Sequence, residues 1–322
     1  MNAAKSLRSG VAKKKCLIYA NCQGNAIGSF LEKSTYFQEK YFIEIINNYI
    51  AIKNKLDIDL ASFDDAELFI YQPINIKHGI YATDYIMKYL PAHCVKISFP
   101  YVYNYAMWPL FEDVNDVKGK EFIIALVEED FSLKEIADKF CRGEIDFEFG
   151  RRFDESITIL RSKENETDVK VVDFILGKLR TEKIFLTHNH HTNSIYIHCA
   201  DQILNMLCFP ALDFTSGIPQ TEICLGECWP QSPYETNFYG LTYLSPWEKY
   251  HPEKKDSNWH RFYLRLIGKI YFSYPMPWIK KVWERIYLYL RIRWSLLVGA
   301  GYLRTVDREK IKGWRNGTRQ KI

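Results

Sequence analysis

The chain has 322 residues, of which 47% are hydrophobic and 25% are charged, and its formal net charge is +4. This length supports a sizeable core and up to two domains, and the composition is that of a folded protein. No apolar run reaches the roughly 18 residues that a membrane-spanning helix requires. The apolar segment behind the basic N-terminus, residues 16–20, is too short for a signal peptide, so we expect a cytoplasmic protein.

Five apolar segments have the length of buried strands, and segments with helical spacing lie between them. The predicted strands are residues 15–20, 42–50, 67–72, 94–99 and 183–187. The predicted helices are residues 25–33, 82–90, 132–140, 154–179, interrupted by the polar stretch 162–167, and 194–207. Strands that alternate with helices predict an α/β fold with a mostly parallel sheet flanked by helices.

The turn after the first predicted strand contains Asn21, Cys22, Gln23, Gly24 and Asn25. It places the Cys22 thiol at a helix N-terminus, where the helix dipole favours negative charge. A cysteine in such a place can have a depressed pKa and act as a nucleophile. The alternative is that Cys22 is a small buried residue that fills a turn. The backbone N–H groups of Gly24 and Asn25 could hold an oxyanion or a phosphate.

Two more polar clusters follow predicted strands. Gln72 ends the third strand, and a histidine-rich loop, residues 188–193, follows the fifth. In open α/β sheets ligands bind at the carboxyl ends of the strands, so these clusters and Cys22 are expected to face one crevice. For Gln72 the alternative is a side chain that only bonds loop backbone.

The histidine loop allows three interpretations: a metal site, a structural loop or a general base. Three histidines crowded into four positions rarely all face inward, and Cys224 and Cys228 form only one CxxxC pair, so we expect no metal. His190 is our first candidate for the base and His188 the substitute. A Cys–His pair within hydrogen-bond reach could perform nucleophilic or general-base chemistry.

Several of these motifs together resemble the WcbI family of capsule-polysaccharide biosynthesis proteins. They are the Asn21–Gly24 turn, Tyr71-Gln72-Pro73, Phe99-Pro100 with Trp108-Pro109, and Asn189-His190-His191-Thr192. The resemblance covers about residues 14–208, and it implies an acetyltransferase that binds coenzyme A, with Cys22 and His190 in its site. Its late loop tends to read His-Pro-Thr, so His191 stands where a proline is expected. No lysine or arginine of the cofactor site can be matched.

The organisation is also similar to that of the SGNH hydrolases, which likewise implies an SGNH- or flavodoxin-like sheet. In those enzymes a nucleophile follows the first strand and a base histidine lies in a late loop. By this analogy Gln72 would contact an oxyanion or the substrate. We expect the polar residues Asn21, Gln23, Gly24, Asn25 and Gln72 to bind the cofactor.

The C-terminal part of the chain is basic and aromatic. Residues 251–322 contain 17 Lys and Arg but only 5 Asp and Glu, so the preceding residues carry a net charge of −8. We therefore predict an α/β domain over 1–250 and a basic helical region over 251–322. Trp278, Val282, Ile286, Leu290 and Trp294 have nearly helical spacing, which is typical of an interfacial helix on an anionic membrane or of ordinary packing. Nothing resembles a base-reading module, so we expect no nucleic acid partner.

The family resemblance, together with Cys22 and the histidine loop, implies an acyltransferase, in particular an O-acetyltransferase that uses acetyl-CoA to modify a sugar of a surface or capsular polysaccharide. The alternatives are an SGNH-type esterase or deacetylase and a non-catalytic, membrane-associated scaffold of glycan assembly. The acceptor sugar and the oligomeric state are left open.

Overall fold

The computed structural model describes residues 12–104, 106–110, 118–214, 229–243 and 259–293. The chain forms two compact units. The first, here called the sheet unit, comprises residues 1–104 and 153–227; the second, the helical unit, comprises 105–152 and 228–322. The units differ from the boundary predicted at residue 250, because residues 105–152 fold with the C-terminal part of the chain.

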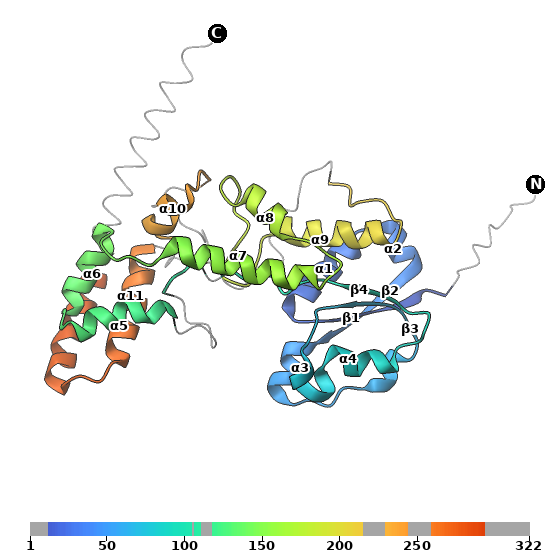
Figure 1. Cartoon of the computed structure of the whole chain (residues 1–322), viewed down its shortest axis with the longest axis horizontal. Coiled ribbons are helices and arrows are strands. Elements are labelled where there is room, and N and C mark those ends of the chain that lie inside the picture. Colours follow the sequence, from blue (N-terminus) through green and yellow to red (C-terminus); the bar gives the residue numbers. More distant parts are fainter. Residues whose placement is uncertain (1–11, 105, 111–117, 215–228, 244–258, 294–322) are drawn as a thin grey trace, which may run out of the picture. The chain divides into compact units, whose positions relative to one another are not determined.

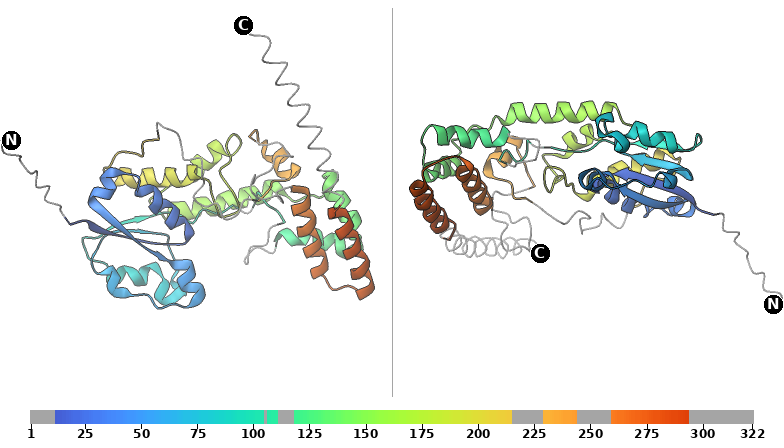
Figure 2. Two further views of the ribbon diagram at one scale, coloured as in Figure 1. Left: turned by 180° about the vertical axis from the view of Figure 1, so that it is seen from behind. Right: turned by 90° about the horizontal axis from the view of Figure 1, so that it is seen from below.

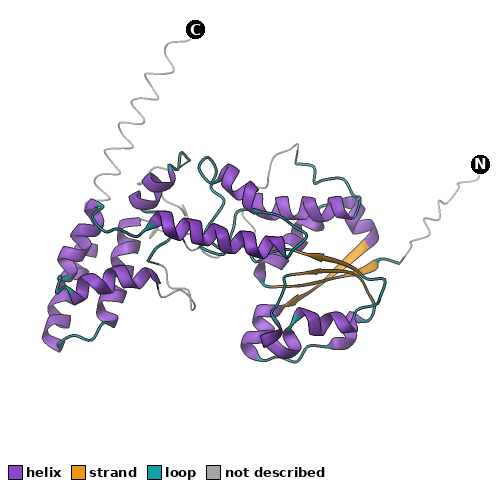
Figure 3. Ribbon diagram, viewed as in Figure 1, coloured by secondary structure: helices purple, strands orange, loops and turns teal. Residues whose placement is uncertain are grey.

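The sheet unit contains a four-stranded parallel sheet, which confirms the predicted α/β class (Figure 1, Figure 3). Its strands are β1 (Lys14–Ala20), β2 (Tyr41–Asn47), β3 (Ala66–Tyr71) and β4 (Val95–Ser98). They lie in the order β2-β1-β3-β4, and every neighbouring pair is parallel. The central strand β1 is buried along nearly its whole length, as expected of a strand covered on both faces.

Seven helices belong to the described part of the sheet unit. They are α1 (Cys22–Leu31), α2 (Thr35–Lys40), α3 (Asn48–Asn54), α4 (Thr83–Ile86), most of α7 (Phe149–Asn165), α8 (Val172–Lys178) and α9 (Asn193–Met206). Helices α1 to α4 lie between the strands in the sequence, and α7 to α9 follow β4. Short 3-10 helices are η1 (Leu60–Phe63), η2 (Ile76–Tyr81) and η3 (Met87–Tyr89). The long predicted helix over 154–179 is divided into α7 and α8, as the polar stretch within it indicated.

Alternate residues of β1 pack against different layers. Leu17 and Tyr19 join a core cluster with Phe63 of η1 and Ile86 of α4. Ile18 and Ala20 point to the opposite face, where they meet α1 close to its glycines. This alternation follows from the two-residue period of a strand, and it places α1 and α4 on opposite faces of the sheet.

The prediction of a fifth strand over residues 183–187 is wrong. Phe185 makes only an isolated antiparallel bridge, with His191. The chain reverses just after Thr187, so the N–H groups of Leu186 and Thr187 donate to the carbonyl of His190 at 2.9 and 3.2 Å. The apolar segment thus pairs with its own loop instead of joining the sheet.

Three further boundaries differ from the prediction. Helix α1 begins at Cys22, not at residue 25. Strand β2 ends at Asn47, whose side chain caps α3 by accepting from the N–H of Ile50 at 3.1 Å. The predicted helix 82–90 is split into α4 and η3.

The helical unit consists of short helices. They are α5 (Lys118–Glu128), α6 (Leu133–Arg142), α10 (Pro233–Tyr239), α11 (Trp259–Ser273) and a helix over residues 278–293. Helix α11 packs against α5 and α6. Ser132 and Glu135 form a capping box at the start of α6, and Ser232 and Glu235 form one at α10.

Gly24 is required for the close approach of α1 to β1, because a Cβ there would lie 2.6 Å from the Cβ of Ala20. We therefore expect Gly24→Ala to lower the free energy of unfolding by about 1–3 kcal/mol, as overpacking does. Gly28→Ala is the matched control. Its Cβ would meet the ends of the Ile18 and Ile45 side chains, at 3.2 and 3.4 Å, which are flexible, and alanine favours the helix. Urea unfolding of both variants measures the difference, and equal stabilities would contradict the packing argument.

Candidate active site

The candidate site lies at the carboxyl ends of β1 and β3. In the order β2-β1-β3-β4 the chain goes from β1 to one side of the sheet and then, with β3, to the other. The loops that leave β1 and β3 therefore diverge, and this is the position where open α/β sheets bind ligands. Asn21 and Gln72 directly follow these two strands.

Cys22 is the first residue of α1 and is partly exposed. Asn21 caps this helix, because its side-chain oxygen accepts from the N–H of Gln23 at 2.9 Å. The N–H of Gly24 donates to the carbonyl of Asn21 at 3.0 Å, so it serves the first turn of the helix. The helix N-terminus favours a negative charge on a group such as the Cys22 sulfur.

The side chain of Gln23 is buried and makes four hydrogen bonds. Its Nε2 donates to the carbonyls of Val102, at 2.8 Å, and Asn189, at 3.0 Å. Its Oε1 accepts from the N–H of Val102 at 3.2 Å and from Nε2 of Gln72 at 3.0 Å. All four positions of the amide are thus used, and they join the Cys22 turn to the segment behind β4 and to the histidine loop.

Gln72 is buried beside Gln23. The side-chain Oε1 of Gln72 accepts from the backbone N–H of Asn21 at 3.0 Å. The backbone N–H of Gln72 donates to the carbonyl of Tyr19 at 3.0 Å. Both hydrogen bonds of the Gln72 side-chain amide are made to other parts of the protein. This agrees with the alternative that Gln72 bonds loop backbone. Asn25 lies on the exposed side of α1.

The histidine loop is held by its own hydrogen bonds. The hydroxyl of Thr187 accepts from the N–H of His190 at 3.1 Å and donates to the side chain of Asn189 at 3.2 Å. The His188 carbonyl accepts from the N–H of Asn104 at 2.8 Å, and its ring lies edge-on to Tyr103 at 5.0 Å. His188 is buried, whereas His190 is partly exposed and so is the more accessible of the two candidate bases.

His191 is a core residue. Its ring is fully buried between Phe185 and Tyr196, with ring centroids 5.2 and 5.5 Å away. Burial lowers the pKa of His191 to about 3, and the neighbouring His190 adds to the effect, so the imidazole stays neutral. Within the described parts of the chain, no three His, Cys, Asp or Glu side chains gather as a metal site would require.

Two residues that the sequence did not single out lie beside the loop. The side-chain amide of Asn189 donates to the hydroxyl of Tyr101 at 3.4 Å, and the ammonium of Lys163 lies 5.1 Å from the centre of the Tyr101 ring. Burial lowers the pKa of Lys163. Tyr101 follows Pro100 just after the end of β4, and this position at a strand end could have marked it as a candidate site residue. No sequence pattern connects Lys163 of α7 with the histidine loop.

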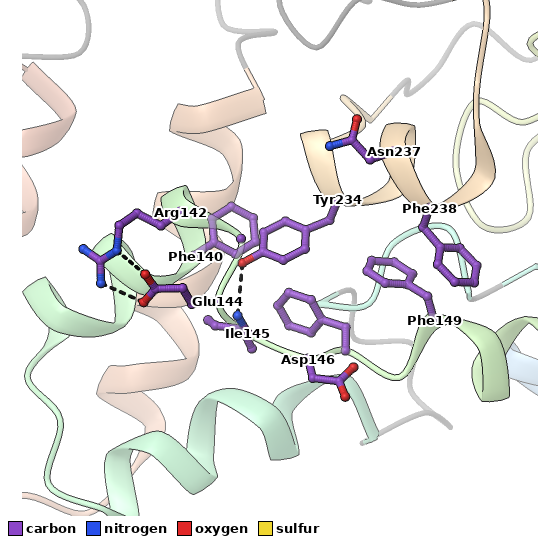
Figure 4. Close-up of a pocket in the computed structure, with 11 residues that line it drawn as sticks. Phe140, Arg142, Glu144, Ile145, Asp146, Phe149, Tyr234, Asn237 and Phe238 are labelled. Atoms are coloured by element: carbon purple, nitrogen blue, oxygen red, sulfur yellow. Dashed lines mark hydrogen bonds and ion pairs between the residues drawn. The ribbon is translucent and has the colours of Figure 1, made fainter.

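The helical unit has a pocket of about 770 Å³ between the end of α6, the segment after it and α10 (Figure 4). Phe140, Phe149 and Tyr234 contribute aromatic walls, and Arg142 pairs with Glu144 at its rim through bonds of 2.5 and 2.8 Å. None of the described residues that line this pocket is one of the predicted site residues.

The fold is that of an α/β protein with an open parallel sheet. Cys22 at the start of α1 and the histidine loop, joined through Gln23 at the switch point of the sheet, form a candidate ligand site. Residues 15–212 match the family described as "Polysaccharide biosynthesis enzyme WcbI". This match covers more than half of the sequence, and the chain belongs to the WcbI family.

Among solved structures, that of WcbI, a polysaccharide biosynthesis enzyme, is similar with a TM-score of 0.65 and 17% sequence identity. The similarity covers 91% of this chain and 99% of WcbI, and at this identity it supports the shared fold. The WcbI structure is described as native protein without a disulfide bond between coenzyme A and one of its cysteines. No curated protein matches the chain significantly.

Among the described residues, none of the helices combines the length and apolarity needed to cross a membrane.

Gln23→Ala removes the amide that joins three segments and leaves the buried polar groups of Val102, Gln72 and Asn189 without these bonds. We expect it to lower the free energy of unfolding by at least about 3 kcal/mol, because each such group costs about 1–3 kcal/mol. Gln38→Ala on exposed α2 is the control and should change stability by about 0.5 kcal/mol or less. A loss below about 1 kcal/mol for Gln23→Ala, in urea unfolding, would contradict the role given to the amide.

The buried His191 should make stability depend on pH. Its imidazole stays neutral down to a pKa of about 3 in the folded protein but takes up a proton near pH 6.5 when unfolded. The unfolded state binds more protons in this window, so stability falls by about 1.4 kcal/mol per pH unit as pH drops from 6.5 toward 3. We expect His191→Phe to remove this contribution, and His78→Phe, at a partly exposed site, to retain it. Parallel pH profiles for wild type and His191→Phe would show that the imidazole does not stay neutral.

Proposed function

We propose that the chain is a cytoplasmic, coenzyme A-dependent acyltransferase, and in particular an O-acetyltransferase that acts on a sugar of a surface or capsular polysaccharide. The observation that carries this proposal is the position of Cys22. Its partly exposed thiol lies at the N-terminus of α1, and its neighbour Gln23 bonds the backbone of the histidine loop. Membership of the family of polysaccharide biosynthesis enzymes supports a sugar as the acceptor.

Coenzyme A as the co-substrate is supported by the WcbI structure, whose description relates coenzyme A to a cysteine. A disulfide between the two can form only where the cofactor thiol and a protein thiol meet. In this chain Cys22 fits that requirement, because it is partly exposed at a helix N-terminus. Tyr101 and Lys163 would offer an aromatic ring and a cation beside the same loop.

In the first of two mechanisms Cys22 is the nucleophile. Acetyl-CoA supplies a thioester, whose carbonyl carbon the Cys22 thiolate attacks. The bond from that carbon to the coenzyme sulfur breaks, and the departing sulfur takes a proton from His190. His190 then removes the proton of the sugar hydroxyl, whose oxygen takes the acetyl group and regenerates the thiolate.

In the second mechanism acetyl-CoA and the sugar are bound together. His190 removes the proton of the hydroxyl, which attacks the thioester directly, and coenzyme A leaves as the thiol with that proton. Cys22 then only orients the thioester. The partial exposure of His190, compared with the buried His188, favours His190 as the base in both routes.

Intact-mass measurement after incubation with acetyl-CoA tests the first route. We expect an acetyl adduct on the wild type that Cys22→Ala abolishes, together with a loss of transferase activity of at least about 100-fold. Cys208→Ser is the control, because Cys208 is an exposed cysteine that a non-specific reaction would also modify. It should keep both the adduct and the activity.

The same measurements separate the rival functions. Full activity of Cys22→Ala with loss in His190→Asn would contradict the first route and support the second. Hydrolysis of acyl esters without a thermal shift by coenzyme A would replace the transferase by an SGNH-type esterase. A scaffold is indicated if neither Cys22→Ala nor His190→Asn changes polysaccharide acylation in cells.

A further inference from the structure

The helix over residues 278–293 exposes a broad apolar face. Six large side chains on it have exposed fractions between 46% and 77%. They are Trp278, Ile279, Trp283, Ile286, Tyr289 and Leu290. Ile279, Trp283, Ile286 and Leu290 recur at intervals of four, three and four residues, and Trp278 and Tyr289 lie beside them on the same side of the helix. Contiguous apolar surface of this kind marks an interaction site.

The other side of this helix is docked within the helical unit. Figure 2 shows it beside α11 in both views. The hydroxyl of Tyr271 donates to Glu284 at 3.4 Å, and the guanidinium of Arg285 lies 5.2 Å from the ring of Phe272. Two ion pairs, Lys280 with Asp130 at 2.8 Å and Arg291 with Asp138 at 2.5 Å, attach it to the loop before α6 and to α6 itself. The helix is therefore folded in place, with its apolar face outward.

The surroundings of the apolar face are strongly basic. Residues 259–293, which contain α11 and this helix, have eight Lys and Arg and a single acidic residue, Glu284. Arg285 and Arg293 are exposed on the helix itself, and Arg265 and Lys269 are exposed on α11. The sequence continues with seven further Lys and Arg against two acidic residues over 294–322. The predicted apolar position Trp294 lies outside the described residues.

We propose that this face binds the surface of an anionic lipid membrane. Trp and Tyr prefer the interface between headgroups and acyl chains, where Trp278, Trp283 and Tyr289 would insert. The basic side chains beside them would meet the phosphates of anionic lipids. This combination of an apolar aromatic face and a cationic border defines a helix that lies in the membrane plane.

Charge decides against a second copy of the chain as the occupant. Two such faces brought together would also bring together two sets of exposed cations, namely Arg265, Lys269, Arg285 and Arg293 of each copy. The cations of the two copies would repel each other, whereas an anionic lipid surface attracts them. The helix is also too polar along its docked side to span a bilayer, which leaves an orientation along the surface.

Co-sedimentation of the full-length protein with lipid vesicles tests the proposal. We expect binding to vesicles of phosphatidylcholine with phosphatidylglycerol, weaker binding to phosphatidylcholine alone, and a decrease with added salt. Trp283→Ala combined with Ile286→Ala should lower the partition coefficient at least tenfold for anionic vesicles. The matched control is Tyr49→Ala with Ile50→Ala, whose side chains on the sheet unit are 58% and 46% exposed; it should bind like the wild type.

The charge contribution is tested separately. Arg285→Gln with Arg293→Gln should weaken binding to anionic vesicles by about fivefold for each lost cation and leave binding to phosphatidylcholine unchanged. Lys53→Gln with Lys77→Gln removes the same charge from the sheet unit and should have no such effect.

Equal vesicle binding by the wild type and Trp283→Ala with Ile286→Ala would overturn the proposal. So would a dimer in analytical ultracentrifugation that this double variant dissociates while neither protein binds vesicles, because the face would then join two copies. Since all substituted side chains are exposed, an unchanged thermal unfolding midpoint verifies that each variant is folded.

Discussion

The buried amide of Gln23 is the constraint on which the candidate site depends. Three segments from distant parts of the sequence meet there, and each contributes backbone or amide groups that would otherwise lie buried without partners. Such a network is favourable only when it is complete, so the Cys22 turn, Gln72 and the histidine loop take up their positions together. The relation between thiol and histidine loop is thus set by a residue that need not take part in the chemistry itself.

Packing between α1 and β1 also positions the Cys22 turn. Gly24 allows α1 to approach β1 so closely that a Cβ in its place would lie 2.6 Å from the Cβ of Ala20, and Asn21 fixes where the helix begins. Cys22 therefore occupies the first helical position for reasons of packing and capping. The positive end of the helix dipole at the thiol follows from this placement.

The sequence predicted those parts of the site that depend on local patterns. Strand β1 and the turn at Cys22 were recognisable because periodicity and capping residues are local signals. The strand predicted over 183–187 failed because an apolar run does not reveal its partner, which is here its own loop. The burial of His188 and His191 and the position of Lys163 beside Tyr101 depend on tertiary contacts between residues far apart in the chain.

His191 shows how the loop keeps its shape without the proline that the family resemblance led us to expect. A proline would restrict the backbone directly, because its ring fixes one dihedral angle. Here the side chain is held between Phe185 and Tyr196, and the Tyr196 hydroxyl accepts from the N–H of His191 at 3.4 Å. The rigidity comes from packing, which holds only while the imidazole remains uncharged in the core. The neutral state of one histidine thereby preserves the loop in which its neighbour His190 stays accessible.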